Sequence, residues 1–357
     1  MSQALALAKK SQGKARPNPS VGALVVKDGK IVGKGSHEIA GKDHAEIIAL
    51  KGAGPSSKGA DLYVTLEPCN HQGKTPPCTN SIISAGISNV YIAMKDPNPL
   101  VNGLGIEYLK NNGINVTSGV MEEEAKKLNL GFLNRMIKSR PYIRSKIAIS
   151  LDGKTSLFNG HSQWITSEAS RADVQKWRLK SCATLTGKGT INSDNPSLSI
   201  KTIPSNQQPL RIILDSHLRV NLESKILQQS NVMVIYGNDQ NLNLTKLKKT
   251  KAEFIKIPLL DNKINLIKLM AYLNKLKINE LWVEAGPDLN GELLKLGLLD
   301  ELITYTAPYI MGGNANSMFN APILEDMKDK IKLTVVDLRS IGEDIRIQAM
   351  LYKDDVD

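Results

Sequence analysis

The chain has 357 residues, which exceeds the roughly 100 to 200 residues of one ordinary domain, so we expect two domains. Its hydrophobic fraction of 41% and charged fraction of 23% lie near globular averages and exclude an intrinsically disordered protein. We find no apolar run long enough to span a bilayer, and residues 1–10 lack the pattern of a signal peptide. We therefore expect a cytoplasmic protein that has no membrane partner.

The formal net charge of +11 arises from 46 basic and 35 acidic residues. Such an excess suits phosphate groups on a substrate or cofactor, and it would also suit nucleic acid. The lysines are scattered, however, and the one dense cluster, Lys246 to Lys251, has no interleaved aromatic residues to stack bases. We expect a solvated basic surface and no nucleic-acid partner. Separately, we expect a homo-oligomer that is either a dimer or a tetramer.

The first 138 residues alternate between helical and strand patterns. Asp28-Gly29 between two apolar runs is a strong hairpin signal, and the later strands are separated by helices. This order implies a mixed sheet with helices on both faces, which is a three-layer α/β/α domain. The expected elements are a helix from Ser2 to Lys10, strands from Val21 to Lys27 and Lys30 to Gly35, a helix from His44 to Lys51, a strand from Ala60 to Leu66, a helix from Cys78 to Gly86, a strand from Asn89 to Met94, a helix from Gly105 to Asn111, a strand from Ile114 to Ser118 and a helix from Met121 to Lys138.

Ser139-Arg140-Pro141 predicts a boundary, because the proline halts the preceding helix. We place one domain at residues 1–140 and a second α/β domain at residues 141–357. For the second domain the patterns predict a strand from Tyr142 to Ser150, a helix capped by Thr166 or Ser167 that runs to Lys180, a helix from Asp288 to Leu296, and strands from Ala183 to Thr186, Leu210 to Leu214, Asn231 to Tyr236, Glu253 to Ile257, Glu280 to Glu284, Leu302 to Ala307 and Ile345 to Tyr352.

His44, Cys69 and Cys78 are the most informative residues of the first domain. Three N and S ligands leave the fourth tetrahedral position of a zinc ion to water, which distinguishes catalytic from structural zinc. Glu46 lies two residues after His44 and can exchange protons with that water, as in zinc-dependent base deaminases. Water bound to zinc has a pKa of about 7. The pattern predicts hydrolytic attack on an amino-bearing ring carbon, with Glu46 as the proton carrier.

Two alternatives remain open for the cysteines and histidines. A structural zinc would need His71 as a fourth ligand, although His71 is better placed as a substrate contact. The odd cysteine, Cys182, lies in an apolar segment and is read as a buried small hydrophobe or a reactive thiol. The pair Cys69 and Cys78 departs from the common Cys-x-x-Cys spacing of base deaminases, because eight residues separate them.

The eight-residue spacing between Cys69 and Cys78 is one of several features in which the sequence resembles one family. Pro17-Asn18-Pro19-Ser20-Val21-Gly22, His44-Ala45-Glu46, the run Glu67 to Cys78 and Asp96-Pro97-Asn98-Pro99 together resemble the deaminase half of the bifunctional riboflavin-biosynthesis deaminase-reductase family. The resemblance implies a cytidine-deaminase-like fold. It also implies that the pyrimidine or its ribose phosphate is contacted by Asn18, His37, His71, Lys74, Asp96 and Asn98. From the residues alone, Asn98 is equally a turn residue and Lys74 a surface residue.

The second domain lacks a Gly-x-Gly-x-x-Gly after a strand, so the sequence does not indicate a Rossmann fold. Two weaker glycine turns are candidates for phosphate binding. Glu284-Ala285-Gly286-Pro287 lies between an apolar strand and a helix, where backbone N–H groups hold pyrophosphate, and it is equally an ordinary connection. Thr186-Gly187-Lys188-Gly189-Thr190 is the other.

In order, five motifs of this half resemble the reductase half of the same family: residues 146–153, 162–166, 186–190, 194–196 and 282–287. The resemblance implies a dihydrofolate-reductase-like α/β fold and NADPH. Cofactor contacts would be Ala148, Trp164, Thr190, Asp194, Ser216, Gly286, Pro287, Asp288, Leu289, Asn290, Gly291 and Glu292. Substrate contacts would be Ser162, Arg178, Leu198, Lys201 and Glu284, with Lys201 where the family often has arginine. Trp164 is equally a core residue and Arg178 a surface one, and Asp194 is a candidate orienting group.

The resemblance implies two consecutive reactions on one chain. The first is zinc-dependent deamination of 2,5-diamino-6-(5-phosphoribosylamino)pyrimidin-4(3H)-one. The second is NADPH-dependent reduction of the ribosyl group of 5-amino-6-(5-phosphoribosylamino)uracil to ribityl. The rivals are a nucleic-acid base deaminase with an accessory C-terminal domain, which leaves that half without a role, and a zinc-stabilised binding module, which does not explain Glu46.

Overall fold

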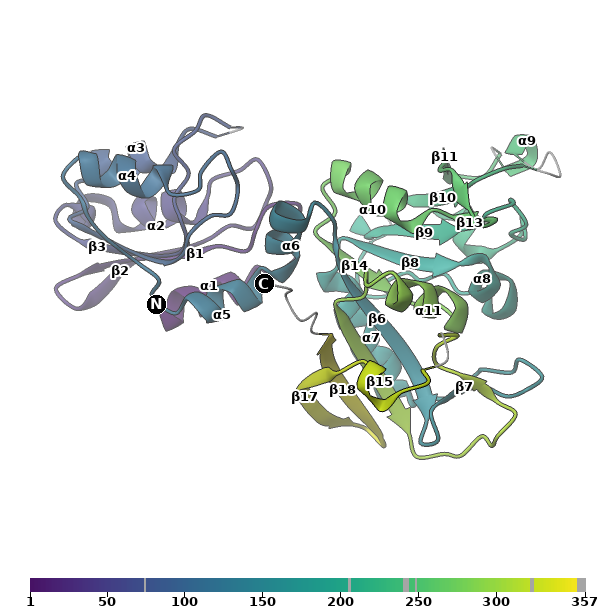
Figure 1. The fold of residues 1–357 in the computed structure, drawn as a ribbon. Helices are drawn as coiled ribbons and strands as arrows, with labels where there is room; N and C mark the ends of the chain where they lie inside the picture. Colours follow the sequence, from purple (N-terminus) through teal and green to yellow (C-terminus); the bar gives the residue numbers. More distant parts are fainter. Residues whose placement is uncertain (74, 205–206, 240–243, 248, 322–323, 352–357) are drawn as a thin grey trace. The chain divides into compact units, whose positions relative to one another are not determined.

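The computed structural model describes residues 1–73, 75–204, 207–239, 244–247, 249–321 and 324–351. The chain divides into two compact units, Met1–Ser139 and Arg140–Asp357, and each has its own sheet (Figure 1). Among the described residues, no helix has both the length and the apolar character that crossing a membrane requires.

The first unit is built around a five-stranded mixed sheet with the strand order β2-β1-β3-β4-β5. Strand β1 pairs antiparallel with β2 and β3, whereas the later pairs are parallel. The expected mixed sheet is therefore confirmed. Its elements are α1 (Ser2–Lys10), β1 (Gly22–Lys27), β2 (Lys30–Ser36), α2 (Ala45–Ala53), the 3-10 helix η1 (Gly54–Ser57), β3 (Asp61–Leu66), α3 (Cys78–Ser84), β4 (Asn89–Met94), α4 (Leu104–Asn111), β5 (Asn115–Ser118), α5 (Glu122–Leu128) and α6 (Leu130–Lys138).

Glycines in the hairpin let one helix approach each face of this sheet. A Cβ at Gly22 would lie 2.1 Å from the Ala4 carbonyl oxygen in α1, and one at Gly35 would lie 2.0 Å from the Ala45 carbonyl oxygen in α2. Gly35 pairs with Ala23, the neighbour of Gly22, so the two glycines point to opposite faces. Helices α1 and α5 cover one face and α2, α3 and α4 the other (Figure 1). The three-layer expectation is confirmed.

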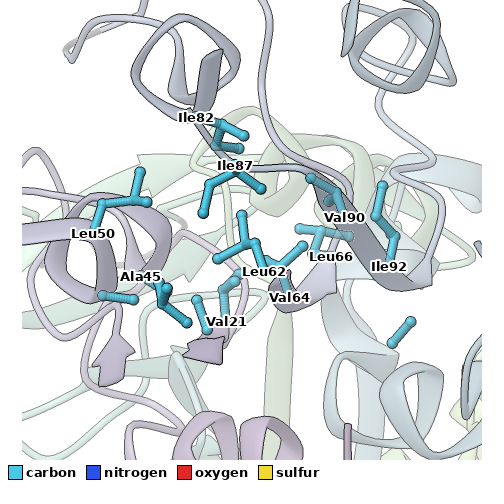
Figure 2. Packing of buried hydrophobic residues seen from close by; sticks show 14 of the residues in the cluster. Val21, Ala45, Leu50, Leu62, Val64, Leu66, Ile82, Ile87, Val90 and Ile92 are labelled. Carbon is cyan, nitrogen blue, oxygen red and sulfur yellow. The ribbon is translucent and has the colours of Figure 1, made fainter. Parts of the chain in front are cut away.

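The core of the first unit is almost entirely aliphatic, as an aromatic fraction of 4% requires. Figure 2 shows side chains from β3, β4, α2 and α3 packed together between the sheet and these helices. Leu62, Val64 and Ile92 have no exposed surface, and Ile82 of α3 is equally buried. This packing fixes the starts of α2 and α3 above the end of β3.

One expected element of the first unit is wrong. The single helix predicted from Met121 to Lys138 is two helices, α5 and α6, which are separated at Asn129. The buried Asn129 side chain accepts a hydrogen bond from Ser20 N at 2.8 Å and donates one to Ser20 O at 3.1 Å. Its backbone leaves the helical region, with φ −125° and ψ 26°. Two hydrogen bonds to a segment that is distant in sequence therefore override the local helical pattern.

The second unit is built on a nine-stranded sheet with the order β11-β10-β9-β8-β14-β6-β15-β18-β17. Neighbours are parallel from β11 to β15, and β18 and β17 add antiparallel pairs. Its elements are β6 (Tyr142–Ser150), β7 (Lys154–Ser156), α7 (Glu168–Lys180), β8 (Ala183–Gly187), α8 (Lys188–Asp194), β9 (Leu210–Leu214), η3 (Lys225–Gln228), β10 (Val232–Tyr236), α9 (Leu244–Leu247), β11 (Glu253–Lys256), β12 (Leu259–Leu260), β13 (Lys263–Ile264), α10 (Leu266–Lys275), β14 (Glu280–Val283), α11 (Pro287–Lys295), β15 (Glu301–Ala307), β16 (Asn316–Ser317), η4 (Met327–Asp329), β17 (Leu333–Ile341) and β18 (Asp344–Leu351).

Strand β14 shows how the two faces of this sheet differ. Leu281 and Val283 pack with residues of α10 and α11, whereas Trp282 packs with α7 on the opposite face. Trp177 of α7 stacks on Trp282, with ring centroids 5.7 Å apart and planes at 4°. The charged groups of Arg144, Lys180 and Arg346 lie 5.4 to 5.8 Å from the Trp177 ring centroid. The α7 face is therefore polar and aromatic, and the other face is aliphatic.

Helix α10 and strand β17 were not predicted, and the expected phosphate turn from Thr186 to Thr190 is the end of β8 followed by α8. The predicted strand from Ile345 to Tyr352 is β18, of which Tyr352 lies outside the described residues. The remaining predicted strands of this unit lie within one residue of the observed bounds at each end.

Candidate metal centre and reductase site

The first unit brings His44, Cys69 and Cys78 together. His44 is the N-cap of α2, Cys78 is the first residue of α3, and Cys69 lies in the loop after β3. His44 Nδ1 lies 3.2 Å from Cys78 Sγ and 3.6 Å from Cys69 Sγ. The ligand-type atoms of all three residues lie within 4.8 Å of one another. The helix starts therefore deliver the set that the sequence predicted.

These distances fit a zinc ion. Tetrahedral bonds of about 2.0 to 2.3 Å place neighbouring N and S ligand atoms about 3.5 Å apart, which is close to both measured separations. One imidazole and two thiols form a three-ligand set of the kind found at catalytic zinc, whose fourth position is left for water or substrate. His71 is not among the clustered residues.

The two thiols interact strongly. The hydrogen bond from the Cys78 thiol lowers the pKa of Cys69 to about 4, and the same hydrogen bond raises the pKa of Cys78. The Cys78 backbone N–H also points to Cys69 Sγ, at 3.5 Å. A thiolate and a thiol that share a proton in this way match a position for a cation, because a metal displaces that proton.

Glu46 is 4% exposed and lies in the first turn of α2. Burial raises its pKa, the negative charge of Cys69 raises it further, and the charge of His44 opposes them. Glu46 also interacts with the Cys78 side chain. The carboxyl group therefore lies beside the cysteines, where a proton acceptor for bound water is needed.

Two predicted substrate residues form a chain that ends beside His44. Asn18 Nδ2 lies 3.0 Å from His37 Nε2, and His37 Nδ1 lies 3.0 Å from the Asp43 carbonyl oxygen. The His37 ring is 5.1 Å from the His44 ring in an edge-on arrangement. Burial lowers the pKa of His37, which favours the neutral imidazole.

The loop between the cysteines is described in part. Thr75 Oγ1 lies 3.4 Å from His44 Nε2, a contact that the sequence did not predict. His71 Nδ1 and Asn70 Oδ1 are buried, and neither has a hydrogen-bond partner among the described residues. The predicted contact Lys74 lies outside the described residues.

Asp96 and Asn98 lie in the segment that joins β4 to α4. Asp96 is 8% exposed, and burial raises its pKa to about 6. The negative charges of Glu67 and Cys69 act in the same direction, so this segment lies near the metal cluster. Asp96 Oδ1 accepts a hydrogen bond from Asn98 N at 2.8 Å.

The second unit has a buried ion pair at the carboxyl end of β14. Arg178 Nε lies 2.5 Å from Glu284 Oε1, Arg178 Nη2 lies 2.9 Å from Oε2, and the Trp282 indole N–H donates to Oε1 at 2.8 Å. Lys146 of β6 is adjacent: the register pairs Val283 with Ser145, Glu284 and Lys146 follow these two residues, and the charge of Glu284 acts on Lys146. Burial lowers the pKa of Lys146, while the charge of Glu284 opposes that shift. The sequence reasoning assigned Lys146 no role, although a lysine inside an apolar strand was the available signal.

A second cluster links the predicted substrate and cofactor residues. Ser162 Oγ donates to Asp194 Oδ1 at 3.0 Å. Arg178 Nη1 donates to the Ser199 carbonyl oxygen at 3.3 Å, between the predicted contacts Leu198, which is buried, and Lys201, which is exposed. Trp164 is 69% exposed beneath the Arg171 guanidinium, so it is not a core residue.

The other predicted cofactor contacts lie at related places in the sheet. Thr190, Ser216 and Gly286 come shortly after the carboxyl ends of β8, β9 and β14, and Ala148 lies in the second half of β6. In open α/β sheets, ligands bind beyond the carboxyl ends of the strands. A Cβ at Gly187, Gly189 or Gly286 would meet nothing within 4 Å.

The turn from Gly286 to Glu292 opens α11. Gly286 is the N-cap, so free backbone N–H groups point out of the helix beside the open glycines. The buried Asn290 fixes this turn, since it accepts from Ser145 Oγ at 2.7 Å and donates to the Ala285 carbonyl oxygen at 3.0 Å. These residues fit the pyrophosphate of a dinucleotide such as NADPH.

Family models match both parts of the chain. Residues 141–347 match the model described as the RibD C-terminal domain. Residues 1–94 match the model of the cytidine and deoxycytidylate deaminase zinc-binding region.

Whole-length relatives and solved structures agree with these matches. The riboflavin biosynthesis protein RibD of Escherichia coli is 42% identical, covering 97% of this chain and 96% of the relative, and that of Aquifex aeolicus is 43% identical with the same coverage. The structure of Acinetobacter baumannii RibD has a TM-score of 0.90 at 40% identity, covering 99% of this chain and 98% of its own. A Thermotoga maritima structure, described as a diaminohydroxyphosphoribosylaminopyrimidine deaminase/5-amino-6-(5-phosphoribosylamino)uracil reductase, has a TM-score of 0.86 at 34% identity, covering 99% and 97%.

Proposed function

The chain belongs to the RibD family of riboflavin biosynthesis proteins, and we propose how its own residues divide the two reactions of that family. The protein is a bifunctional deaminase and reductase that uses zinc and NADPH. We assign residues 1–140 to the deaminase domain and residues 141–357 to the reductase domain. The convergence of His44, Cys69 and Cys78 beside Glu46 carries the first assignment.

In the deaminase domain, His44, Cys69 and Cys78 hold one zinc ion. When bound, zinc supplies a Lewis acid that makes water nucleophilic at neutral pH. Glu46 is placed to hold a proton inside the site and to pass it to the departing ammonia, because its buried carboxyl group lies beside the cysteines. In net terms a carbon–oxygen bond from water replaces the carbon–nitrogen bond, and ammonia leaves with one proton of that water.

Four further residues orient the pyrimidine in this proposal. Asn18 and His37 form a hydrogen-bonded pair next to His44, and Asp96 with Asn98 approaches from the β4–α4 segment. His71 adds a buried nitrogen that lacks a partner among the described residues and is free to bind substrate. The sixth contact, Lys74, is proposed from the family resemblance alone.

In the reductase domain, Arg178, Glu284 and Lys146 form the floor of the substrate site, with Ser162, Leu198 and Lys201 at its side. NADPH supplies a hydride when it is bound. These residues would hold the ribosylamino carbon in position to receive it, and with the uptake of one proton from solvent the sugar ring would open to a ribityl group. Lys146 adds an amine next to the Glu284 carboxylate, so the floor offers both a nitrogen and carboxylate oxygens to the substrate.

The substrates proposed are the phosphoribosylated diaminopyrimidinone for the first domain and its deaminated uracil for the second. A cytoplasmic location is part of the proposal, since both substrates are small phosphorylated metabolites. The proposal also includes a homo-oligomeric state, dimer or tetramer.

The test supplies the full chain with the phosphoribosylated diaminopyrimidinone, with and without NADPH, and follows both products by mass. We expect the deaminated uracil and ammonia without NADPH, and the ribityl product when NADPH is added. Absence of ammonia release would refute the first assignment. Failure to oxidise NADPH with the deaminated uracil would refute the second.

A further inference from the structure

The carboxylate of Glu67 is the acceptor of an unusual set of hydrogen bonds. Oε2 accepts from Asp96 N at 3.2 Å and from Gly103 N at 2.9 Å. Oε1 accepts from Gly105 N at 3.0 Å and from Ile106 N at 3.2 Å. All four donors are backbone N–H groups of the segment between the end of β4 and the first turn of α4.

Glu67 is also buried, with 3% of its surface exposed, and no cation pairs with it within the described part of the chain. A buried carboxylate is costly unless other groups replace its hydration. Four charge-assisted hydrogen bonds and the positive end of the α4 dipole replace it here. The segment and the carboxylate therefore hold each other in one arrangement.

This contact joins the two halves of the deaminase site. Glu67 follows the last residue of β3 and precedes the ligand Cys69 by two positions, while the bonded segment begins with Asp96. The fit is close on both sides, since a Cβ at Gly105 would lie 2.1 Å from the Pro68 carbonyl oxygen. Gly103 has a φ of +96°, which a residue with a side chain rarely adopts.

We propose that Glu67 is a positioning residue of the deaminase: it fixes residues 96–106 against the end of β3, and so sets the distance between the substrate contacts and the metal ligands. The inference rests on the proposed function, because it requires Asp96 and Asn98 to contact the pyrimidine. Glu67 itself touches neither substrate nor metal. Its role is to make Cys69 and Asp96 parts of one rigid body.

The test is Glu67→Gln in the full chain. The amide nitrogen has nearly the same shape as the oxygen it replaces, but it faces backbone donors and cannot accept from them. We expect the deaminase KM for the phosphoribosylated diaminopyrimidinone to rise about tenfold or more while kcat changes by less than about threefold, because binding contacts are misplaced and the proton carrier is not. Zinc content and NADPH-dependent reduction of the deaminated uracil should stay at wild-type values.

Leu109→Ala is the matched control. Leu109 is fully buried in α4, so the substitution weakens the packing of the same helix and leaves the carboxylate and its donors in place. A merely structural role predicts that both variants lower the unfolding temperature and leave KM unchanged. An unchanged KM in folded Glu67→Gln would overturn the proposal, and so would loss of zinc, since the effect would then act through Cys69.

Gly105→Ala covers the case in which Glu67→Gln does not fold. The added Cβ would lie 2.1 Å from the Pro68 carbonyl oxygen and 3.2 Å from Glu67 Oε1, so it displaces the same segment while the charge of Glu67 is kept, and the same selective rise in KM is expected. Folded Gly105→Ala with a wild-type KM would overturn the proposal. Absence of deaminase activity in the wild-type chain is a different result, since it refutes the proposed function before any variant is compared.

Discussion

Arg178 and Glu284 form a bidentate ion pair at the carboxyl end of β14, with the two guanidinium nitrogens 2.5 and 2.9 Å from the two carboxylate oxygens. Burial raises the pKa of Glu284, but the charge and hydrogen bonds of Arg178 outweigh burial and lower that pKa to about 2. Glu284 is therefore a carboxylate across the physiological pH range.

The first prediction concerns acid stability. The folded pKa of Glu284 lies below its unfolded value of about 4.5, so the pair stabilises the second unit above that pH. This contribution, about 3 kcal/mol, should be lost as the pH falls from about 4.5 towards 2. Urea unfolding followed by circular dichroism across this range should show that the unfolding free energy of Glu284→Gln falls less with decreasing pH than that of the wild type. The same pH dependence in both proteins would show that Glu284 does not carry this contribution.

The second prediction concerns Glu46. Glu46→Gln keeps the shape of the side chain but removes the proton acceptor. Ammonia release should fall about 10²- to 10⁴-fold, the range typical of a lost general acid–base group. One zinc per chain and wild-type NADPH oxidation with the deaminated uracil should remain. Near-normal ammonia release from the zinc-loaded variant would exclude Glu46 as the proton carrier.

The third prediction concerns the thiols. Cys78→Ser should lose zinc and ammonia release together, because a hydroxyl is a poor substitute for a thiolate ligand. Cys182→Ser is the matched control: Cys182 lies in the second unit, outside the cluster of ligand atoms, and its variant should keep one zinc per chain by atomic emission. Chelation of the wild-type protein should abolish deamination and leave reduction intact. A reductase that fails on chelation would contradict the separation of the two sites.

The fourth prediction concerns Lys201, which the family resemblance aligned with an arginine. Its side chain is exposed, and its backbone N–H is held by Gln175 at 3.1 Å. Lys201→Arg offers a bidentate donor to a substrate phosphate, so the reductase KM should fall about fivefold, equivalent to about 1 kcal/mol. Lys268→Arg, on the exposed surface of α10, is the control and should leave KM unchanged. An equal KM in Lys201→Arg and wild type would remove Lys201 from the phosphate site.

Local patterns predicted the metal cluster well. His44, Cys69 and Cys78 each stand at a helix start or a strand end, and these boundaries are marked by short signals of glycine, proline and alternating hydrophobicity. Once the strands of a mixed sheet have paired, the end of β3 and the starts of α2 and α3 lie at the same edge of the sheet. In the second unit the resemblance, and not local patterns, named Thr190, Ser216 and Gly286, and the structure shows that these residues come shortly after the carboxyl ends of β8, β9 and β14.

Local sequence patterns could not predict contacts between segments that are far apart in the sequence. The break at Asn129 depends on Ser20, and the role of Glu67 depends on donors 29 to 39 positions away. Lys146 is visible in the sequence as a lysine inside an apolar strand, but its partner Glu284 cannot be named until β6 and β14 pair. In each case a polar group is buried in an otherwise apolar stretch, and its partner cannot be named until the chain has folded.

All three tryptophans of the chain, Trp164, Trp177 and Trp282, belong to the second unit. Indole fluorescence therefore reports on the reductase half alone, whereas the deaminase half has to be followed by its bound metal. Unfolding of the two halves can be recorded separately on one intact sample. Trp164, exposed among the predicted NADPH contacts, should also give an optical signal for cofactor binding that is silent to the zinc content of the first unit.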